Sequence, residues 1–410
     1  MTKIKTNRNN TNNVPPLRFP EFSGEWKGHK LSEYLSFKNG LNPNGNRFGR
    51  GIKFISVMDI LNNDIITYDC IRTSVQATAD ELAAFAVEKG DILFQRSSET
   101  LEDIGRANVY MDNKPAIFGG FVIRGKKAGD YNPLFFRYLL SNPLARKKII
   151  PLGAGAQHFN IGQENLCRVK LNFPTLQEQS KIATIFTLID NRIATQNKII
   201  EDLEQLKSAL TDQLYSGQLR FHEFADDWGV STFGHLTEHF SHRNRNSKHY
   251  PVFSVTKDTG FIPQEEQFES REITGDDISS YKIIRQGEFA YNPARINVGS
   301  IARYDNETPC LISSLYVCIK PATDIDSDWL LYLLKSKRAI FYYNLYGEGG
   351  VRIYLFYPNF SRIKVKVPSI QEQHRIAALL KYIADKILQE KKLKDLYITQ
   401  KQFLLQRMFI

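Results

Sequence analysis

The chain has 410 residues, of which 42% are hydrophobic and 24% are charged. That length predicts about two to four domains, and that composition excludes wholesale disorder and collagen-like or fibrous states. No apolar run approaches the roughly 18 residues that a membrane span needs. Residues 1–13 are rich in Asn, Thr and Lys and lack the apolar core of a secretory signal, so we interpret them as a disordered tail.

The cysteines and the charge balance limit the setting and the partners of the chain. None of the four cysteines forms a Cys-x-x-Cys pair, which argues against a thiolate zinc site and favours a reducing, cytoplasmic location. Lys and Arg total 54 and Asp and Glu total 44, so the net charge is +10. Because a basic surface attracts phosphates at long range, this balance favours a polyanionic partner. Charge alone does not decide the matter, since many basic enzymes bind no nucleic acid.

Two sequence motifs occur twice and in the same order. Leu-Arg-Phe-x-Glu-Phe, followed by Trp, lies at 17–26 and again at 219–228. Pro-x-x-Gln-Glu-Gln lies at 174–179 and again 194 residues later, at 368–373. Repeated motifs in a constant order indicate an internal duplication, and we place the two copies at residues 14–217 and 218–410.

A long helix is predicted at the end of each copy. A Thr-x-x-Glu or Ser-x-x-Glu sequence follows a proline at 175–178 and 369–372, and this pattern predicts a capping box in which the Glu side chain returns to the N–H of the cap residue. Neither Pro nor Gly then occurs until Gly217, a suitable helix stop, or before the last residue of the sequence. We expect helices over 174–217 and 368–410, each about 60 Å long.

The apolar residues of these helices recur at steps of three and four, close to the coiled-coil period. We therefore expect the helices to pair, and to do so in antiparallel fashion, since a duplicated chain closes most simply on a pseudo-two-fold axis. Two amphipathic helices that pack separately on their own domains are the alternative. The predicted seam includes Ile182, Ile189, Leu203, Leu210, Ile376, Ile383, Leu396 and Leu404.

The segments before the helices, 14–173 and 218–367, have the pattern of mixed α/β domains with short strands. The predicted fold class is α+β, with two mixed α/β domains related by pseudo-two-fold symmetry and joined by two long antiparallel coiled-coil helices. Expected strands lie at 52–59, 90–96 and 118–124, with counterparts at 250–256, 287–292 and 311–320. One helix is expected at 132–149 and its counterpart at 327–345.

The sequence contains no motif that we interpret as catalytic or metal-binding. The His-x-x-Glu-His pattern at 235–239 is replaced by Lys-x-x-Glu-Tyr at 30–34 in the first copy, so we interpret its shared frame as structural. The P-loop, the dinucleotide-binding glycine motif and the Gly-x-Ser-x-Gly elbow are all missing, so we predict no catalytic and no metal-binding residues. Two alternatives to a DNA-binding role remain. One is a stand-alone methyltransferase or nuclease with divergent motifs, and the other is a coiled-coil adaptor with two protein-binding domains.

The loops between the strands carry side chains of the kinds that contact phosphates and base edges. They differ between the two copies more than the rest of the chain does, which suggests two related surfaces that read two different sequences. The candidate DNA-binding residues are Asn44, Arg47, Arg50, Gln95, Arg96, Ser98, Arg106, Gln157, His158 and Asn160 in the first copy, and Arg243, Arg245, Lys248, Asn292, Arg295, Asn297, Arg352 and Tyr354 in the second.

With the two repeated motifs and the helix after each, the sequence resembles the specificity (S) subunits of type I restriction–modification systems over about residues 14–410. The resemblance implies two target-recognition domains in inverted orientation, each reading one half of an asymmetric split target in double-stranded DNA. It implies that the coiled coil fixes the spacer between the halves and docks the modification subunits.

The resemblance also implies what the chain itself does not do. Two modification subunits would bind S-adenosylmethionine and methylate adenine, and two restriction subunits would use ATP and Mg²⁺ to cut unmethylated DNA in host defence. No cofactor is then expected in this chain.

Overall fold

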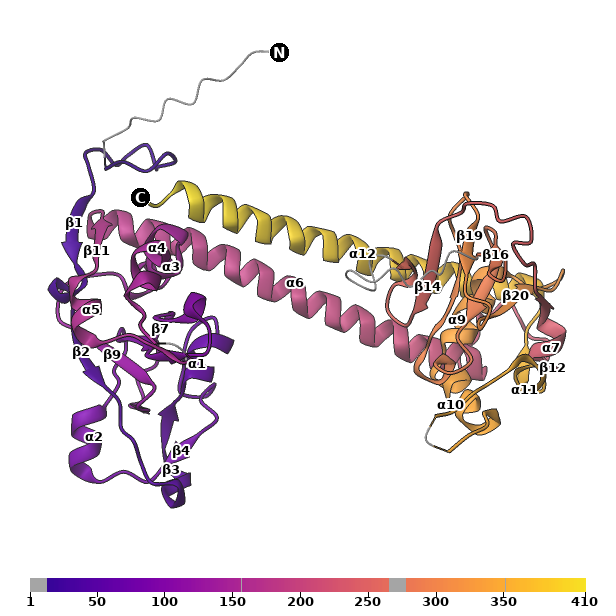
Figure 1. The fold of residues 1–410 in the computed structure, drawn as a ribbon, viewed down its shortest axis with the longest axis horizontal. Coiled ribbons are helices and arrows are strands. Elements are labelled where there is room, and N and C mark those ends of the chain that lie inside the picture. Colours follow the sequence, from indigo (N-terminus) through magenta and orange to yellow (C-terminus); the bar gives the residue numbers. More distant parts are fainter. Residues whose placement is uncertain (1–12, 156, 265–277, 351) are drawn as a thin grey trace, which may run out of the picture. The chain divides into compact units, whose positions relative to one another are not determined.

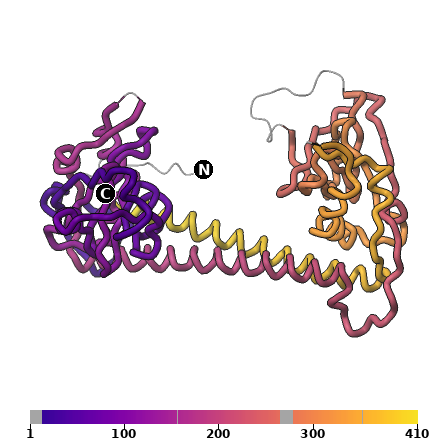
Figure 2. The backbone as a smooth tube through the Cα atoms, turned by 90° about the horizontal axis from the view of Figure 1, so that it is seen from below, coloured from indigo at the N-terminus to yellow at the C-terminus, as the bar shows by residue number. Residues whose placement is uncertain are grey.

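The computed structural model describes residues 13–155, 157–264, 278–350 and 352–410. Residues 1–12 of the predicted tail lie outside the described residues. The chain divides into two compact units: unit 1 is Met1–Gln196 with Leu393–Ile410, and unit 2 is Asn197–Lys392 (Figure 1, Figure 2). This division passes through both long helices, whereas the predicted boundaries separate each mixed domain from its helix.

The mixed domain of unit 1 is built on two main sheets. Its strands are β1 Lys27–Lys30, β2 Leu35–Asn39, β3 Phe48–Ile55, β4 Ser74–Val75, β5 Ile92–Gln95, β6 Ser97–Ser98, β7 Ala107–Val109, β8 Ile117–Phe118, β9 Val122–Lys127, β10 Phe159–Asn160 and β11 Lys170–Phe173. An antiparallel sheet has the order β2-β9-β5-β7, and a second sheet has the order β4-β3-β8, in which β3 and β8 are parallel. β1 pairs with β11, and β6 pairs with β10.

The mixed domain of unit 2 repeats this topology. Its strands are β12 Gly229–Thr232, β13 Thr237–Phe240, β14 Val252–Thr256, β15 Gly260–Pro263, β16 Lys282–Ile284, β17 Phe289–Tyr291, β18 Ile301–Arg303, β19 Cys310–Ile312, β20 Val317–Pro321 and β21 Lys364–Val367. The order β13-β20-β17-β18 matches the antiparallel sheet of unit 1, and β15-β14-β19-β16 contains the same parallel pairing, here between β14 and β19. β12 pairs with β21 as β1 does with β11. The duplication predicted from the motifs is confirmed in these sheet orders. Among the described residues, the β6–β10 pair of unit 1 and β16 of unit 2 have no counterpart strands.

Short helices complete both domains, and they correct the predicted helix in each. The helices are α1 Val57–Asn62, α2 Ala79–Phe85, α3 Pro133–Ser141, α4 Pro143–Ile149, α5 Gln163–Arg168, α7 Phe233–Leu236, α9 Ser327–Lys335, α10 Lys337–Tyr346 and α11 Tyr357–Phe360. The single helix predicted at 132–149 is wrong because Asn142 ends α3 and its side chain accepts a hydrogen bond from the N–H of Leu144 to begin α4. Ser336 divides the counterpart helix in the same way.

Three of the predicted strands end early or are interrupted by a turn. The strand predicted at 52–59 ends at Ile55, because Ser56 and Asp59 form a capping box that begins α1. The strands predicted at 118–124 and 311–320 are each interrupted by a turn, which we call the β8–β9 turn (119–121) and the β19–β20 turn (313–316). These two turns are central to the surface described below.

Two long helices follow the mixed domains, α6 Leu176–Ser216 with 41 residues and α12 Ile370–Arg407 with 38 residues. Gly217 has φ of +74° and ends α6 in the left-handed conformation that favours glycine, as predicted. At each start, the N–H of Glu178 or Glu372 donates to the cap hydroxyl at 3.3 Å. Within the described parts of the chain, no helix combines the length and apolar character needed to cross a membrane.

The Glu side chains of the two helix starts have a different role from the one predicted. In unit 1 the Glu178 carboxylate accepts hydrogen bonds from Arg18 Nε at 2.8 Å, Arg18 Nη2 at 2.7 Å and Trp26 Nε1 at 3.2 Å. In unit 2 the Glu372 carboxylate accepts from Arg220 Nε at 3.0 Å and Nη2 at 2.9 Å, and from Trp228 at 2.9 Å. Only the hydroxyl half of the capping-box prediction is therefore confirmed. Within each copy, the Leu-Arg-Phe-x-Glu-Phe…Trp motif therefore binds the Pro-x-x-Gln-Glu-Gln motif.

The neighbouring glutamines fasten a second element to each helix start. Gln179 Oε1 accepts from the N–H of Asn132, the cap residue of α3, at 3.0 Å, while its Nε2 donates to the carbonyl of Pro174 at 3.1 Å. Gln373 does the same with the N–H of Asp326 at 2.9 Å and the carbonyl of Pro368 at 3.1 Å. The Gln-Glu-Gln sequence thus joins the domain opening, the short helix and the long helix.

The long helices pack against each other in an antiparallel arrangement within each unit, as predicted. In unit 1 the first turns of α6, with Ile182 and Phe186, cluster with Leu404 of α12 and with Phe409, which follows α12. The two helical segments lie side by side in both views (Figure 1, Figure 2). In unit 2, Ile200 of α6 packs with buried residues of the first half of α12, Ile383 and Ile387. The start of each helix therefore faces the later part of the other.

One predicted seam residue is wrong. Leu396 is 65% exposed, whereas the other predicted positions are buried or half-buried. Gln196 and Glu390, which are 5% and 9% exposed, occupy seam positions. A search for apolar residues alone overlooks both of these polar positions. The buried and half-buried seam positions, at steps of four and three, are Ile182, Phe186, Ile189, Ile193, Gln196, Ile200, Leu203 and Leu210 in α6, with Ile376, Leu380, Ile383, Ile387, Glu390 and Leu404 among those in α12.

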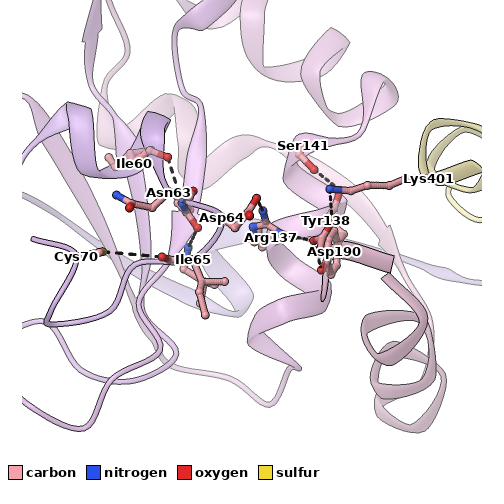
Figure 3. A network of polar contacts seen from close by, with 12 residues as sticks. Ile60, Asn63, Asp64, Ile65, Cys70, Arg137, Tyr138, Ser141, Asp190 and Lys401 are labelled. Atoms are coloured by element: carbon pink, nitrogen blue, oxygen red, sulfur yellow. Dashed lines mark hydrogen bonds and ion pairs between the residues drawn. The ribbon is translucent and has the colours of Figure 1, made fainter. Parts of the chain in front are cut away.

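A polar network in unit 1 ties the mixed domain to both long helices (Figure 3). Arg137 and Tyr138 of α3 bond to Asp190 of α6 at 3.1 Å and 2.7 Å, and Lys401 of α12 approaches the same carboxylate at 2.5 Å. Burial opposes ionisation of Asp190, but the hydrogen bonds from Lys401 and Tyr138 outweigh it and lower its pKa. Arg137 also reaches Asp64 at 3.2 Å, so one arginine joins a loop of the sheet domain to the helices.

Removing the Glu178 carboxylate should destabilise unit 1. Glu178→Ala leaves the Arg18 guanidinium and the Trp26 N–H without their acceptor in a site where the glutamate is 1% exposed. We expect a loss of about 3 kcal/mol in the free energy of unfolding, measured by urea denaturation. Glu201→Ala is the matched control, because this carboxylate is exposed on the same helix, and it should change the value by less than about 0.5 kcal/mol. Equal effects would contradict the role of Glu178.

The seam assignment separates two apolar side chains of α12. Ile383 is 6% exposed and packs in the unit 2 cluster, so Ile383→Ala should cost about 2–4 kcal/mol. Leu396→Ala should cost less than about 0.5 kcal/mol, since Leu396 is 65% exposed. Urea denaturation measures the free energy of unfolding of the two variants. A larger loss for Leu396→Ala than for Ile383→Ala would support the predicted seam that includes Leu396.

Candidate nucleic-acid interface

In unit 1 the β8–β9 turn lies between two of the predicted groups of DNA-binding residues. On one side, Leu41 forms a β-bridge with Gly119 and begins the loop that contains Asn44 and Arg47 and leads to Arg50 in β3. On the other side, the N–H of Arg96 donates to the carbonyl of Phe121 at 2.8 Å, and its guanidinium donates to that of Gly120 at 3.1 Å. The turn therefore joins the loop after β2 to the end of β5.

The glycines of this turn are needed for the close approach. A Cβ on Gly120 would lie 1.7 Å from Oδ1 of Asn42, and one on Gly119 would lie 2.8 Å from the ring of Phe54. A larger residue at 120 would displace the Asn42 side chain, and one at 119 would press on the ring of Phe54. The predicted strand at 118–124 runs through this turn, although the Gly119-Gly120 pair is a local turn signal.

The third predicted group joins the same surface through β6 and β10. Ser97 pairs with Asn160 and Ser98 with Phe159, the Ser97 hydroxyl bonds to the Asn160 side chain, and the N–H of Ile161 donates to the carbonyl of Arg96 at 3.0 Å. Gln157, His158 and Asn160 are thus brought beside the end of β5. The N–H of Gln95 donates to the carbonyl of Arg106, which places Arg106 at the same strand end.

Unit 2 assembles the corresponding loops around the β19–β20 turn. Arg243 forms a β-bridge with Lys282, and the ammonium of Lys282 donates to the carbonyl of Tyr316 in the turn at 2.5 Å. Beyond the end of β17, the N–H of Leu355 donates to the carbonyl of Pro293 at 2.9 Å, which joins the segment with Asn292, Arg295 and Asn297 to the loop with Arg352 and Tyr354.

The described residues of the loops at 153–160 and 347–354 share two backbone features despite their different sequences. Each contains one β-bridge, Ala154 with Asn160 and Glu348 with Tyr354. Each also contains a glycine at positive φ, +146° at Gly155 and +117° at Gly349. Equivalent positions therefore present Asn160 in one domain and a tyrosine in the other. A shared scaffold therefore carries different candidate contact groups in the two domains.

The predicted DNA-binding residues differ in exposure. Gln95 is 4% exposed, and its side-chain amide donates to the carbonyl of Ser97. Its prediction as a DNA contact is therefore wrong for this structure, in which it is a buried part of the strand end. The half-buried residues are Arg47, Arg96, Ser98, Asn292 and Asn297. The exposed residues are Asn44, Arg50, Arg106, Gln157, His158, Asn160, Arg243, Arg245, Lys248, Arg295, Arg352 and Tyr354. For these, DNA contact remains a prediction.

Arg47 is engaged within the domain. Its guanidinium forms a two-point contact with the Glu81 carboxylate and also donates to the carbonyl of Gln76. The hydrogen bond from Arg47 lowers the pKa of Glu81 to about 2. Arg47 therefore holds the loop after β2 in place, while Arg50 in β3 is exposed.

Sequence reasoning missed three residues of this surface, namely Phe121, Leu315 and Lys282. Phe121 and Leu315 lie in the two turns and are 68% and 77% exposed. A signal for the turns was present in the Gly119-Gly120 and Ser313-Ser314 pairs, since paired small residues interrupt strand patterns.

Within the described residues, no group of three His, Cys, Asp or Glu side chains is arranged to hold a metal ion.

Comparison with known proteins assigns the fold to a family. The profile of the type I restriction modification DNA specificity domain matches residues 23–205 and 230–396, once in each copy. The chain belongs to this family. As a specificity subunit it has DNA and other restriction–modification subunits as its partners.

Curated relatives support the same assignment. A putative type I restriction enzyme specificity subunit of Methanocaldococcus jannaschii, MjaX, is 24% identical over 414 residues, covering 93% of this chain and 92% of the relative. The HindI specificity subunit of Haemophilus influenzae is 28% identical over 194 residues, covering 45% of this chain and 40% of the relative.

Solved structures share the fold. The type I restriction–modification S subunit from M. genitalium superimposes with a TM-score of 0.57 at 16% identity, covering 97% of this chain and 99% of that one. A chain from a study of complex assembly and conformational transition of the type I system has a TM-score of 0.58 at 15% identity, covering 96% and 99%. The predicted fold class is confirmed in its two mixed domains and long helices.

The different environments of two nearby arginines predict different consequences of their removal. Arg50→Ala should weaken DNA binding and reduce the slope of log affinity against log salt by about one, without changing thermal stability, because the side chain is exposed. Arg47→Ala should lower thermal stability, since Glu81 and Gln76 lose their donor. Salt-dependent fluorescence anisotropy and thermal denaturation measure the two effects, and the reverse pattern would contradict these placements.

Proposed function

We propose that the chain is the DNA-recognition subunit of a type I restriction–modification complex and reads a bipartite, asymmetric target. The observation that carries this proposal is the repeated surface: two domains of one topology each gather polar loops around an equivalent turn. Their side chains differ at equivalent positions, as with Asn160 and Tyr354. Two different half-targets follow from that difference.

The chemistry of the exposed residues supports this function. Arg and Lys side chains such as Arg50, Arg243, Arg245 and Lys248 suit phosphates and guanine edges, and Asn side chains suit adenine edges. The net charge of +10 favours association with a polyanion. Family membership favours the specificity role over the adaptor and the stand-alone enzyme.

We assign the remaining activities to partner subunits. In this proposal the chain is non-catalytic and holds no cofactor, two modification subunits bind S-adenosylmethionine and methylate adenine, and two restriction subunits use ATP and Mg²⁺. The paired helices dock the modification subunits and set the spacer between the half-targets. The complex would act in the cytoplasm.

Methylome sequencing of cells that carry this chain with its modification subunits tests the proposal. We expect one methylated motif with two unlike halves separated by an unspecified spacer. Replacing residues 14–173 with the equivalent domain of another specificity subunit should change one half alone. A palindromic motif, or a change in both halves, would contradict separate reading by the two domains.

The same sequencing tests the role of the helices. Duplicating the seven residues Gln196–Asp202 in α6 and Glu390–Leu396 in α12 keeps the seam period and lengthens both helices by about 10 Å. Methylation at the original spacer should then be lost while the half-sequences stay the same. Retention of the original spacer would show that the helices do not set it.

A further inference from the structure

Two of the most exposed apolar side chains occupy equivalent positions in the two domains. Phe121 and Leu315 lie 194 residues apart, the offset of the repeated Gln-Glu-Gln motif, and are 68% and 77% exposed. Phe121 precedes Val122, which pairs with Gln95 at the end of β5, and Leu315 lies two residues before Val317, which pairs with Tyr291 at the end of β17. Both side chains therefore stand at the strand end where the predicted polar contacts converge.

The local sequence differs while the apolar character is retained. The first turn reads Gly-Gly-Phe and the second reads Ser-Ser-Leu. Isolated exposed apolar residues are common on protein surfaces and need no explanation, and Val230 on β12, 71% exposed, is one such residue. Phe121 and Leu315 differ from Val230 because each lies in the turn around which the candidate loops gather.

A cationic side chain is fixed to the backbone of each turn. The guanidinium of Arg96 donates to the carbonyl of Gly120, and the ammonium of Lys282 donates to that of Tyr316. Positive charge beside an exposed apolar group is unfavourable for an apolar protein partner, but it is complementary to DNA, where phosphates flank the base edges.

The surroundings of Phe121 provide room for an apolar group. A hollow of about 360 Å³ lies beside it, and among the described residues that line this hollow none is acidic. Phe48 and Met58, 40% and 59% exposed, lie on its wall with Phe121. In the major groove, the apolar group that a base pair presents is the 5-methyl group of thymine.

We propose that Phe121 and Leu315 each contact the 5-methyl group of a thymine in the half-target that its domain reads. This inference rests on the proposed function and names the chemistry of one contact in each half. The neighbouring Arg, Asn and Lys side chains bond to polar edges and phosphates, and the apolar side chain distinguishes thymine by its methyl group.

The test uses the chain in complex with its modification subunits and a duplex that carries the methylated motif. Each thymine of the duplex is replaced in turn by uracil, which removes only the methyl group, and affinity is measured by fluorescence anisotropy. One replacement in each half should weaken the affinity of the complex without substitutions about fourfold, which corresponds to the free energy of burying one methyl group. Phe121→Ala should abolish the sensitivity in one half, Leu315→Ala should abolish it in the other, and Val230→Ala should leave both sensitivities intact.

Several outcomes would overturn the inference without touching the proposed function. These are a half-target without thymine, binding that is insensitive to every uracil replacement, and a Phe121→Ala variant that keeps the sensitivity or loses only subunit assembly. Insensitivity to uracil together with weaker binding of Phe121→Ala would indicate a wedge between base pairs instead. If the complex without substitutions binds its motif no more tightly than random duplex DNA, the proposed function itself fails.

Discussion

The buried bond between a glutamate at the start of each long helix and the Arg and Trp of each domain opening organises this molecule. Glu178 receives Arg18 and Trp26, and Glu372 receives Arg220 and Trp228. A carboxylate that is 1% exposed is costly unless its partners are supplied, so the opening segment of each copy must fold back onto its own helix. The adjacent glutamines add the short helix of each domain to the same point. The repeated motifs are thus structural, and the residues that vary between the copies are left to the loops.

This division explains how one scaffold presents two surfaces. The strand orders match between the domains, and the loops at 153–160 and 347–354 share a β-bridge and a glycine at positive φ. Backbone hydrogen bonds and glycine conformation fix where a loop runs, and they do so whatever side chains the loop carries. The side chains at 160 and 354 can therefore differ while the two loops keep their course, although the Asn160 side chain also bonds to Ser97.

The seam between the paired helices contains polar residues among its apolar ones. Apolar residues fill most of the seam, but Gln196 and Glu390 occupy it at equivalent levels and are nearly buried. A polar seam residue reduces stability and favours the register in which its polar atoms are satisfied. In unit 1, Asp190 adds a second constraint, because Lys401 of α12 and Arg137 and Tyr138 of α3 all bond to it. Helix pairing and domain position are thereby coupled through one carboxylate.

The sequence by itself determined the duplication, the two long helices and the mixed character of the domains. Repeated motifs, the lack of Pro and Gly and the spacing of apolar residues are local properties, and they can be read along the chain. It also located the loops that form the candidate surface.

Only the tertiary structure decided which residues of those loops face solvent. Gln95 and Arg47 have the residue types of DNA contacts, but one is buried at a strand end and the other is held by Glu81, a residue 34 positions away. The β8–β9 turn lies inside a predicted strand, and the residues that crowd its glycines, Asn42 beside Gly120 and Phe54 beside Gly119, are distant in sequence. The partner of a side chain far along the chain sets its exposure, and no local pattern encodes that partner.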